Sequence, residues 1–279
     1  FLASGLWAVT VMNEYDHILG FHKINAFRDA VHNSVGGKEN YFQVEERIDF
    51  DPYTILGQKT KGGKITEKDC LVMQEIWKGP HTTGNDFLWY SFLPGGTFWN
   101  KIIPIGSFYY PLIGKRPKCF SLVEQYVHLA FEDPKKDLLH LKIRDFEKVF
   151  DTCIRKLGWL SCDHADLRPF ANAGGKLIID HGLDDPLIPV EGTIDYYHHM
   201  REIHGGQNFI DRFCRLYINP GDGHGNCHTN GPGMTESTGI QALMNWVEHN
   251  KAPENLPAVL VNQKTGKTIR KGIVKPWRV

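Results

Sequence analysis

Two side chains that could act together in catalysis follow short apolar runs late in the sequence. Asp185 follows the run in KLIIDHGLDDPLIP (176–189), and His224 follows the run in CRLYINPGDGH (214–224). An aspartate beside a histidine fixes the tautomer of the imidazole and stabilises its protonated form, so that the ring accepts and returns a proton. The residue types therefore predict acid–base chemistry, with Asp185 orienting His224.

Both side chains follow segments that we predict to be strands. Short apolar runs between turn signals, at 177–179 and 214–218, indicate buried parallel strands. In open α/β sheets, sites form at the carboxyl ends of the strands. The two side chains are 224 − 185 = 39 residues apart, which leaves room for one helix between the strands. Acid before histidine is the order of the α/β-hydrolase triad, in which a serine nucleophile comes first.

That serine nucleophile is not identifiable in the sequence. It requires a small–x–Ser–x–small turn between a strand and a helix. None of the serines stands in a G-x-S-x-G context: Ser4, Ser34, Ser91, Ser107, Ser121, Ser161 and Ser237. Ser237, in TESTG, follows the histidine and is typical of an N-cap region. Because two parallel strands cannot form a sheet buried on both faces, we interpret the α/β part as the second half of a domain.

Composition limits the class of protein. The chain has 279 residues, enough for one large domain or two smaller ones, with 41% hydrophobic and 23% charged residues. Lys+Arg and Asp+Glu are 32 each, so the net charge of zero argues against a nucleic-acid or charged-membrane partner. No run approaches the roughly 18 apolar residues of a membrane span. The chain opens on Phe1 without a signal-peptide pattern, which predicts a processed chain or an excised fragment.

The remaining segments predict mostly helices around an irregular aromatic stretch. Helical patterns cover 6–33, with a polar break at 13–16, then 67–77 capped by Thr66, 124–131, 144–157, 193–203 and 235–249. Residues 258–279 predict one or two strands. The stretch 81–114 is rich in aromatic residues with little periodicity, and is either a satellite core or a binding wall. In the last helix we expect four side chains to face inward: Leu243, Met244, Trp246 and Val247.

These motifs together resemble the tannase and feruloyl esterase family. The matching segments are GGKLIIDHGLDDPLIPVEGTIDYY (174–197), FCRLYINPGDGH (213–224) and ALMNWVEHNKAPENLPA (242–258), with weaker similarity between about 81 and 140. The resemblance implies an α/β fold. It would be the C-terminal part of an α/β-hydrolase sheet with an inserted, irregular, aromatic-rich lid. Residues 1–44 would be a helical segment of the core, 45–142 the lid, and 143–279 the half of the core with the acid and the histidine.

The resemblance also implies roles for individual residues. Asp185 would be the triad acid and His224 the catalytic histidine of a serine carboxylic-ester hydrolase that acts on aromatic esters, gallate or hydroxycinnamate. The family's serine lies in a C-S-x-G-G elbow upstream of the region covered here. The nucleophile would therefore come from an N-terminal segment or a partner chain. The family is largely secreted, which predicts an extracellular location, and neither nucleic acid nor membrane is expected as a partner.

Three features concern the surroundings of this site. In the family a cysteine follows the catalytic histidine directly, whereas here Cys227 comes two residues later than that position. A disulfide between Cys227 and the nucleophile half is therefore an open candidate. The same shift makes His228 a second candidate, beside His224, for the catalytic histidine. The D-x-x-D-G spacing of a lid calcium loop is absent near 36–46, so we expect no calcium and no other cofactor. Four lid aromatics are candidates for stacking on a phenolic acyl group: Trp89, Tyr90, Phe98 and Trp99.

Other interpretations of the same residues stay open. An Asp at a strand end is often an Asx turn or a cap, and we interpret His181 as structural. His224, Cys227 and His228 could hold zinc, although a second ligand pair at standard spacing is missing. The alternative is a non-catalytic chain that retains the hydrolase scaffold and has a binding or structural function. The presence or absence of a serine elbow, in the same polypeptide or in a partner chain, decides between the two functions.

Overall fold

The chain divides into two compact units, which are described one at a time. The computed structural model describes residues 2–35, 41–42, 48–96, 120–226, 231–262 and 264–278. Unit 1 comprises Phe1–Val31, Ile48–Ser161 and Pro186–Pro189, and unit 2 comprises His32–Arg47, Cys162–Asp185 and Val190–Val279. The boundaries expected near 45 and 143 stay a prediction.

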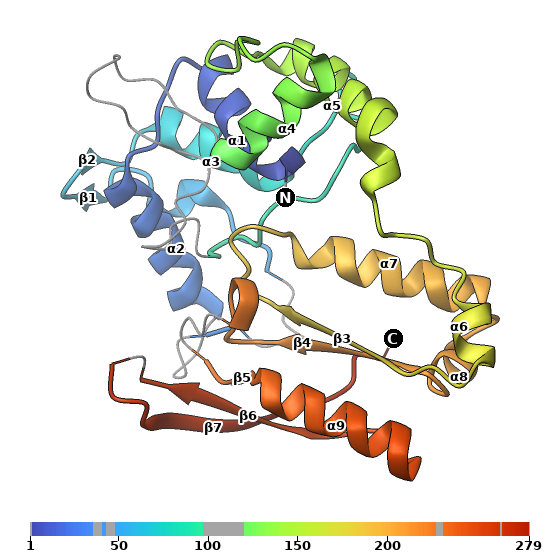
Figure 1. The fold of residues 1–279 in the computed structure, drawn as a ribbon. Coiled ribbons are helices and arrows are strands. Elements are labelled where there is room, and N and C mark those ends of the chain that lie inside the picture. Colours follow the sequence, from blue (N-terminus) through green and yellow to red (C-terminus); the bar gives the residue numbers. More distant parts are fainter. Residues whose placement is uncertain are drawn as a thin grey trace. The chain divides into compact units, whose positions relative to one another are not determined.

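Unit 1 is mainly helical (Figure 1). Its elements are α1 (Leu2–Glu14), α2 (Phe21–Val35, which runs into unit 2), η2 (Pro52–Ile55), α3 (Glu67–Lys78), α4 (Ser121–Phe131), α5 (Ile143–Leu157) and η3 (Gly158–Leu160), with a short hairpin of β1 (Lys59–Thr60) and β2 (Gly63–Lys64). α1 contacts α3, α4 and α5 and is buried over most of its length. None of the helices in the described ranges combines the length and the apolarity that crossing a membrane requires.

The predicted helices of unit 1 form for the expected local reasons. α5 presents Phe146, Val149 and Leu157 to the core at helical spacing. α3 begins with a capping box, in which the Thr66 side chain accepts from Asp69 N and the Asp69 carboxylate accepts from Thr66 N. In the described part of the aromatic stretch, Phe92 is buried in this core whereas Phe87 is 62% exposed.

The Asp69 carboxylate also holds two distant side chains. Lys23 Nζ lies 2.6 Å from Oδ2, and His17 Nε2 lies 2.7 Å from Oδ1, while the Asp69 side chain is fully buried. Burial alone would raise the pKa of Asp69, but hydrogen bonds from Lys23, Thr66 and His17 outweigh it and lower the pKa. Asp69 therefore joins the segment before α2 and the start of α2 to the start of α3.

Unit 2 contains the two predicted parallel strands. β3 (Leu177–Gly182) pairs in parallel with β4 (Cys214–Asn219), in a register that sets Leu177 opposite Cys214 and Gly182 opposite Asn219. Three helices flank or connect them: α6 (Arg168–Asn172), α7 (Val190–Ile203) and α8 (Gln207–Ile210). β4 is buried at every position, and burial raises the pKa of the Cys214 thiol to about 12, as befits a cysteine that packs as a hydrophobic side chain.

The end of the chain adds a second sheet and the last helix. β5 (Gly233–Met234), β6 (Leu256–Val261) and β7 (Thr268–Val274) form an antiparallel sheet, and a bridge between Tyr217 and Pro276 connects the tail to β4. The prediction of one or two strands in the tail is confirmed. α9 (Glu236–His249) starts at the N-cap Thr235, whose side chain accepts from Thr238 N.

The inward face predicted for α9 is half wrong. Trp246 is buried and Leu243 is partly buried, but Met244 is 50% exposed and Val247 is 61% exposed. Helical periodicity places Ile240, Met244 and Val247 on one stripe, and this stripe faces away from the residues that α9 covers. The helix thus has apolar side chains on two faces, of which unit 2 buries one.

Candidate active site

The loops that follow β3 and β4 are tied together by backbone contacts. Leu183 N donates to Asn219 O at 2.8 Å, and Asp184 N donates to Asp222 O at 2.9 Å. A Cβ on Gly182 would lie 2.4 Å from Asp222 O, so the close approach of the two loops requires glycine there. Parallel pairing of the strands brings both carboxyl ends to the same edge, and these contacts fix the spacing of the loops beyond it.

Asp185 and His224 meet at this edge. His224 Nδ1 lies 3.0 Å from Asp185 Oδ2; the Asp185 side chain is 5% exposed, whereas the His224 side chain is 40% exposed. The carboxylate is therefore held in the protein while the ring reaches solvent. When Nδ1 donates to the carboxylate, Nε2 is left as the proton acceptor, which is the arrangement of a general base.

A second imidazole approaches the same carboxylate. His181 Nε2 lies 3.5 Å from Asp185 Oδ2, and its Nδ1 lies 2.7 Å from the hydroxyl of Thr193 on the first turn of α7. The sequence indicated a structural role for His181 and did not identify Thr193. The signal for His181 was its four-residue spacing from Asp185, which becomes a contact because the chain turns after Gly182, where Asp185 N donates to Gly182 O at 3.3 Å.

A buried carboxyl group adjoins this cluster. Glu191 also lies on the first turn of α7, and its Oε2 is buried without a hydrogen-bond partner among the described residues. Burial raises the pKa of Glu191, while a backbone hydrogen bond and nearby His181 act in the opposite direction.

Several predicted site residues fall elsewhere. Cys227, His228, Phe98 and Trp99 lie outside the described residues, as does most of 36–46. Trp89 and Tyr90 belong to unit 1, where their rings form an edge contact with centroids 5.4 Å apart. Their part in substrate binding therefore stays a prediction. The structure brings Asp185 and His224 together and adds His181 and Thr193.

The described cysteines show no cross-link among themselves. Cys70, Cys153, Cys162 and Cys214 form no disulfide with one another, and Cys70 and Cys214 are buried. The described ranges also hold no group of three or more His, Cys, Asp or Glu side chains that could bind a metal ion. The predicted disulfide of Cys227 is not tested by these residues.

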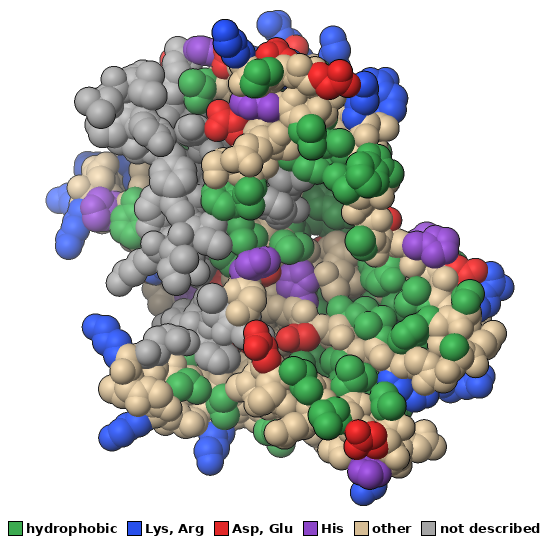
Figure 2. Space-filling model, in the orientation of Figure 1, with side chains coloured by type: hydrophobic (Ala, Val, Ile, Leu, Met, Phe, Trp, Pro, Cys, Tyr) green, Lys and Arg blue, Asp and Glu red, His purple; other side chains and the backbone are tan. Residues whose placement is uncertain are grey.

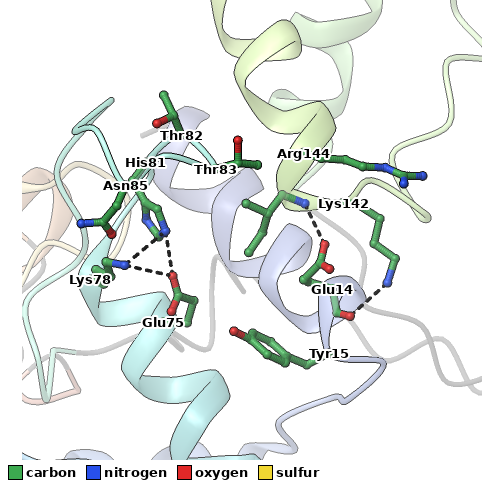
Figure 3. A pocket seen from close by; sticks show the side chains of 11 residues that line it. Glu14, Tyr15, Glu75, Lys78, His81, Thr82, Thr83, Asn85, Lys142 and Arg144 are labelled. Carbon is green, nitrogen blue, oxygen red and sulfur yellow. Dashed lines mark hydrogen bonds and ion pairs between the residues drawn. The ribbon is translucent and has the colours of Figure 1, made fainter.

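Unit 1 contains a polar cavity of about 530 Å³, between the end of α1, the end of α3 and the start of α5 (Figure 3). Its charged walls bind one another: His81 Nε2 lies 2.9 Å from Glu75 Oε1, and Glu14 Oε2 accepts from Ile143 N at 3.0 Å. Lys142 Nζ donates to Glu14 O at 3.1 Å. None of the predicted site residues lines this cavity, whose polar contacts join α1 to the start of α5 and α3 to the segment that follows it.

Comparison with known proteins identifies relatives. The family described as tannase and feruloyl esterase matches residues 117–277. A probable feruloyl esterase of Arthroderma benhamiae is 27% identical over 278 residues, which cover 92% of this chain and 49% of the relative. The chain therefore spans about half the length of this relative.

Solved structures show the same fold. A tannin acyl hydrolase from Aspergillus niger superposes with a TM-score of 0.78 at 22% identity, over 99% of this chain and 54% of the other. Feruloyl esterase B from Aspergillus oryzae gives a TM-score of 0.80 at 15% identity, over 99% and 57%. The fold is thus α/β-hydrolase-like, as the motifs predicted. Since the family match covers more than half of the residues, the chain belongs to the tannase and feruloyl esterase family.

Proposed function

We propose that this chain carries the acid and the histidine of a serine carboxylic-ester hydrolase. The observation that supports this most is the 3.0 Å contact between His224 Nδ1 and Asp185 Oδ2, at the adjoining ends of two parallel strands. His224 Nε2 would take the proton of a serine hydroxyl as the hydroxyl attacks the ester carbonyl, then give it to the leaving alcohol. Water would repeat the step on the acyl-enzyme and regenerate the serine.

Asp185 and His181 would hold the base in place. The carboxylate orients His224 and stabilises the imidazolium that forms during each proton transfer. His181, directed at the same oxygen and held by Thr193, would keep the carboxylate from rotating. These residues supply proton transfer and positioning; the nucleophile and the oxyanion hole would come from an N-terminal segment or a partner chain.

The expected substrates are aromatic esters, such as those of gallate or hydroxycinnamate. The support is the family, whose relatives are named as feruloyl esterases and tannases. Residues 45–142 would form the lid, with Trp89, Tyr90, Phe98 and Trp99 as stacking candidates. We propose that the reaction needs no cofactor and that the protein is extracellular. A Cys227 disulfide to the nucleophile half remains part of the proposal.

The test is labelling of the native protein with a fluorophosphonate, followed by intact mass with and without reductant. We expect label on a serine outside these 279 residues. It would lie on the same polypeptide or on a second chain; release of that chain by reductant would support the Cys227 disulfide. A lone unlabelled species of the mass of this chain, 31.8 kDa, would favour the non-catalytic alternative.

Replacing Gly182 by Ala is expected to lower ester hydrolysis roughly 100-fold, because a small displacement of catalytic groups has effects of that size. The added methyl group would meet Asp222 O and push apart the loops that hold Asp185 and His224. The measurement is kcat/KM for methyl ferulate and methyl gallate. Gly20→Ala is the matched control, since a Cβ there meets nothing within 4 Å. Equal rates for both variants would contradict the role of this close approach.

A further inference from the structure

The side chains of residues 255–279 carry only positive charge. This segment contains four lysines and two arginines but no Asp or Glu, although the net charge of the whole chain is zero. Both arginines have contacts within the protein: Arg278 pairs with Glu254 at 3.0 Å, and Arg270 lies over the ring of Tyr41. The four lysines form no ion pair with any residue in the part of the chain that the structure describes. Four positive charges in this segment can therefore meet a partner.

Three of these lysines lie with two isoleucines along one face of β7. Ile269, Lys271 and Ile273 are exposed, whereas the residues between them are partly buried. Lys267 and Lys275 directly flank β7 and are exposed as well. Side chains two residues apart on a strand are about 6.6 Å apart, so these five form a row roughly 26 Å long with a lysine about every 13 Å. We call these five side chains the Lys–Ile row.

The surroundings of the Lys–Ile row add apolar surface and no opposite charge. β7 is an outer strand of the sheet β5-β6-β7, and these three strands contain neither an acidic nor an aromatic residue. Ile269 is 61% and Ile273 67% exposed. Strand pairing sets Pro257 beside Ile273 and Val259 beside Lys271, which extends the apolar surface onto β6. In Figure 2, basic side chains project from the surface formed by the β6–β7 hairpin.

We propose that the Lys–Ile row binds a linear acidic polysaccharide, a chain of sugar rings that carry carboxylate groups. The lysines would pair with carboxylates, and the isoleucines would contact the apolar C–H faces of the rings between them. A straight row of evenly spaced charges matches the repeat of a linear polymer better than a single small anion. This inference goes beyond the proposed hydrolase, because no residue of the row belongs to the candidate active site.

Two other anionic partners match this face less well. Proteins that bind single-stranded nucleic acids stack the bases on aromatic side chains, which β5, β6 and β7 lack. Amphipathic elements that lie on a membrane keep cations on one face and apolar side chains on the other, so that only the apolar face enters the lipid. Here lysines and isoleucines alternate on a single face. An acidic sugar ring presents a carboxylate beside an apolar ring face, which matches this alternation.

The test measures binding of the native protein to immobilised polygalacturonate over a range of salt concentrations. The wild type should bind at low ionic strength and weaken as salt is added, because salt screens contacts between exposed charges. The triple variant Lys267→Gln, Lys271→Gln, Lys275→Gln should bind roughly 30-fold more weakly, since one exposed ion pair contributes a factor of about three. The double variant Ile269→Thr, Ile273→Thr should bind roughly fivefold more weakly and keep the salt dependence of the wild type, because it removes apolar contacts only.

The matched control replaces the same number of lysines on another hairpin. Lys59, Lys61 and Lys64 are exposed on β1, on β2 and in the turn between them. Their replacement by Gln changes the net charge equally and should leave polygalacturonate binding unchanged. Equal urea midpoints for the wild type and all variants show that each variant is folded.

Three results would overturn the proposal. The first is absence of binding by the wild type at low salt, or an equal loss of affinity in the control variant. The second is tighter binding to phosphatidylserine vesicles or to duplex DNA than to polygalacturonate at equal salt. The third is a lysine triple variant that self-associates but still binds polygalacturonate, because the lysines would then protect the edge of β7 from pairing with other strands.

Discussion

Asp185→Asn is expected to reduce kcat/KM for an aryl ester by roughly 10⁴-fold, the size of effect seen when a triad aspartate becomes an amide. The asparagine amide would donate to Nδ1 of His224, which shifts the ring proton to Nε2 and removes the proton acceptor. The Asp185 side chain is 5% exposed and also approached by His181, so water cannot readily substitute for the carboxylate. The measurement is steady-state hydrolysis of methyl gallate and methyl ferulate by the native protein.

Two further variants make this result specific. Asp195→Asn changes an exposed carboxylate on α7 and should leave the rate within twofold or so of the wild type. His224→Ala should be at least as inactive as Asp185→Asn, because it removes the base itself. If His224→Ala retains activity while His228→Ala loses it, the catalytic histidine is His228 and our assignment is wrong.

Asp69→Ala is expected to lower the free energy of unfolding of unit 1 by about 3 kcal/mol, as for other buried ion pairs that lose one partner. The change leaves Lys23 and His17 without their common carboxylate and removes half of the capping box of α3. The measurement is urea denaturation at neutral pH. Asp145→Ala is the control: it too lies in the first turn of a helix, but its side chain is 55% exposed and lies 3.6 Å from Arg144. A loss no larger than that of the control would contradict the role of Asp69.

The same carboxylate predicts the direction of a pH effect. The pKa of Asp69 is lower in the folded protein than in the unfolded chain, where it is about 3.9. The contribution of the ionised Asp69 to the stability of the folded protein is therefore fully present above the pKa of the unfolded chain. It is lost as the pH falls through the lower pKa of the folded protein. Urea midpoints measured from pH 7 to pH 3 should fall more steeply for the wild type than for Asp69→Ala. Parallel slopes would mean that other carboxylates dominate acid unfolding.

Features that depend on neighbouring residues were predictable from the sequence alone. The strands β3 and β4, the helix α5 and the cap at Thr66 follow from apolar spacing and from side chains within three residues of the helix start. The pairing of Asp185 with His224 was predictable as well. Each follows a strand, and parallel strands that are adjacent in the sheet end at the same edge.

Contacts between residues whose order along the chain carries no signal depend on the tertiary structure. Thr193 reaches His181 because α7 starts beside the end of β3, and Asp69 meets Lys23 and His17 across 46 and 52 residues. The local sequence pattern could not predict the orientation of α9 either. Apolar residues occupy two of its faces, and helical periodicity cannot say which face unit 2 buries. That choice depends on the shape of the strands beneath the helix, which exists only once the chain has folded.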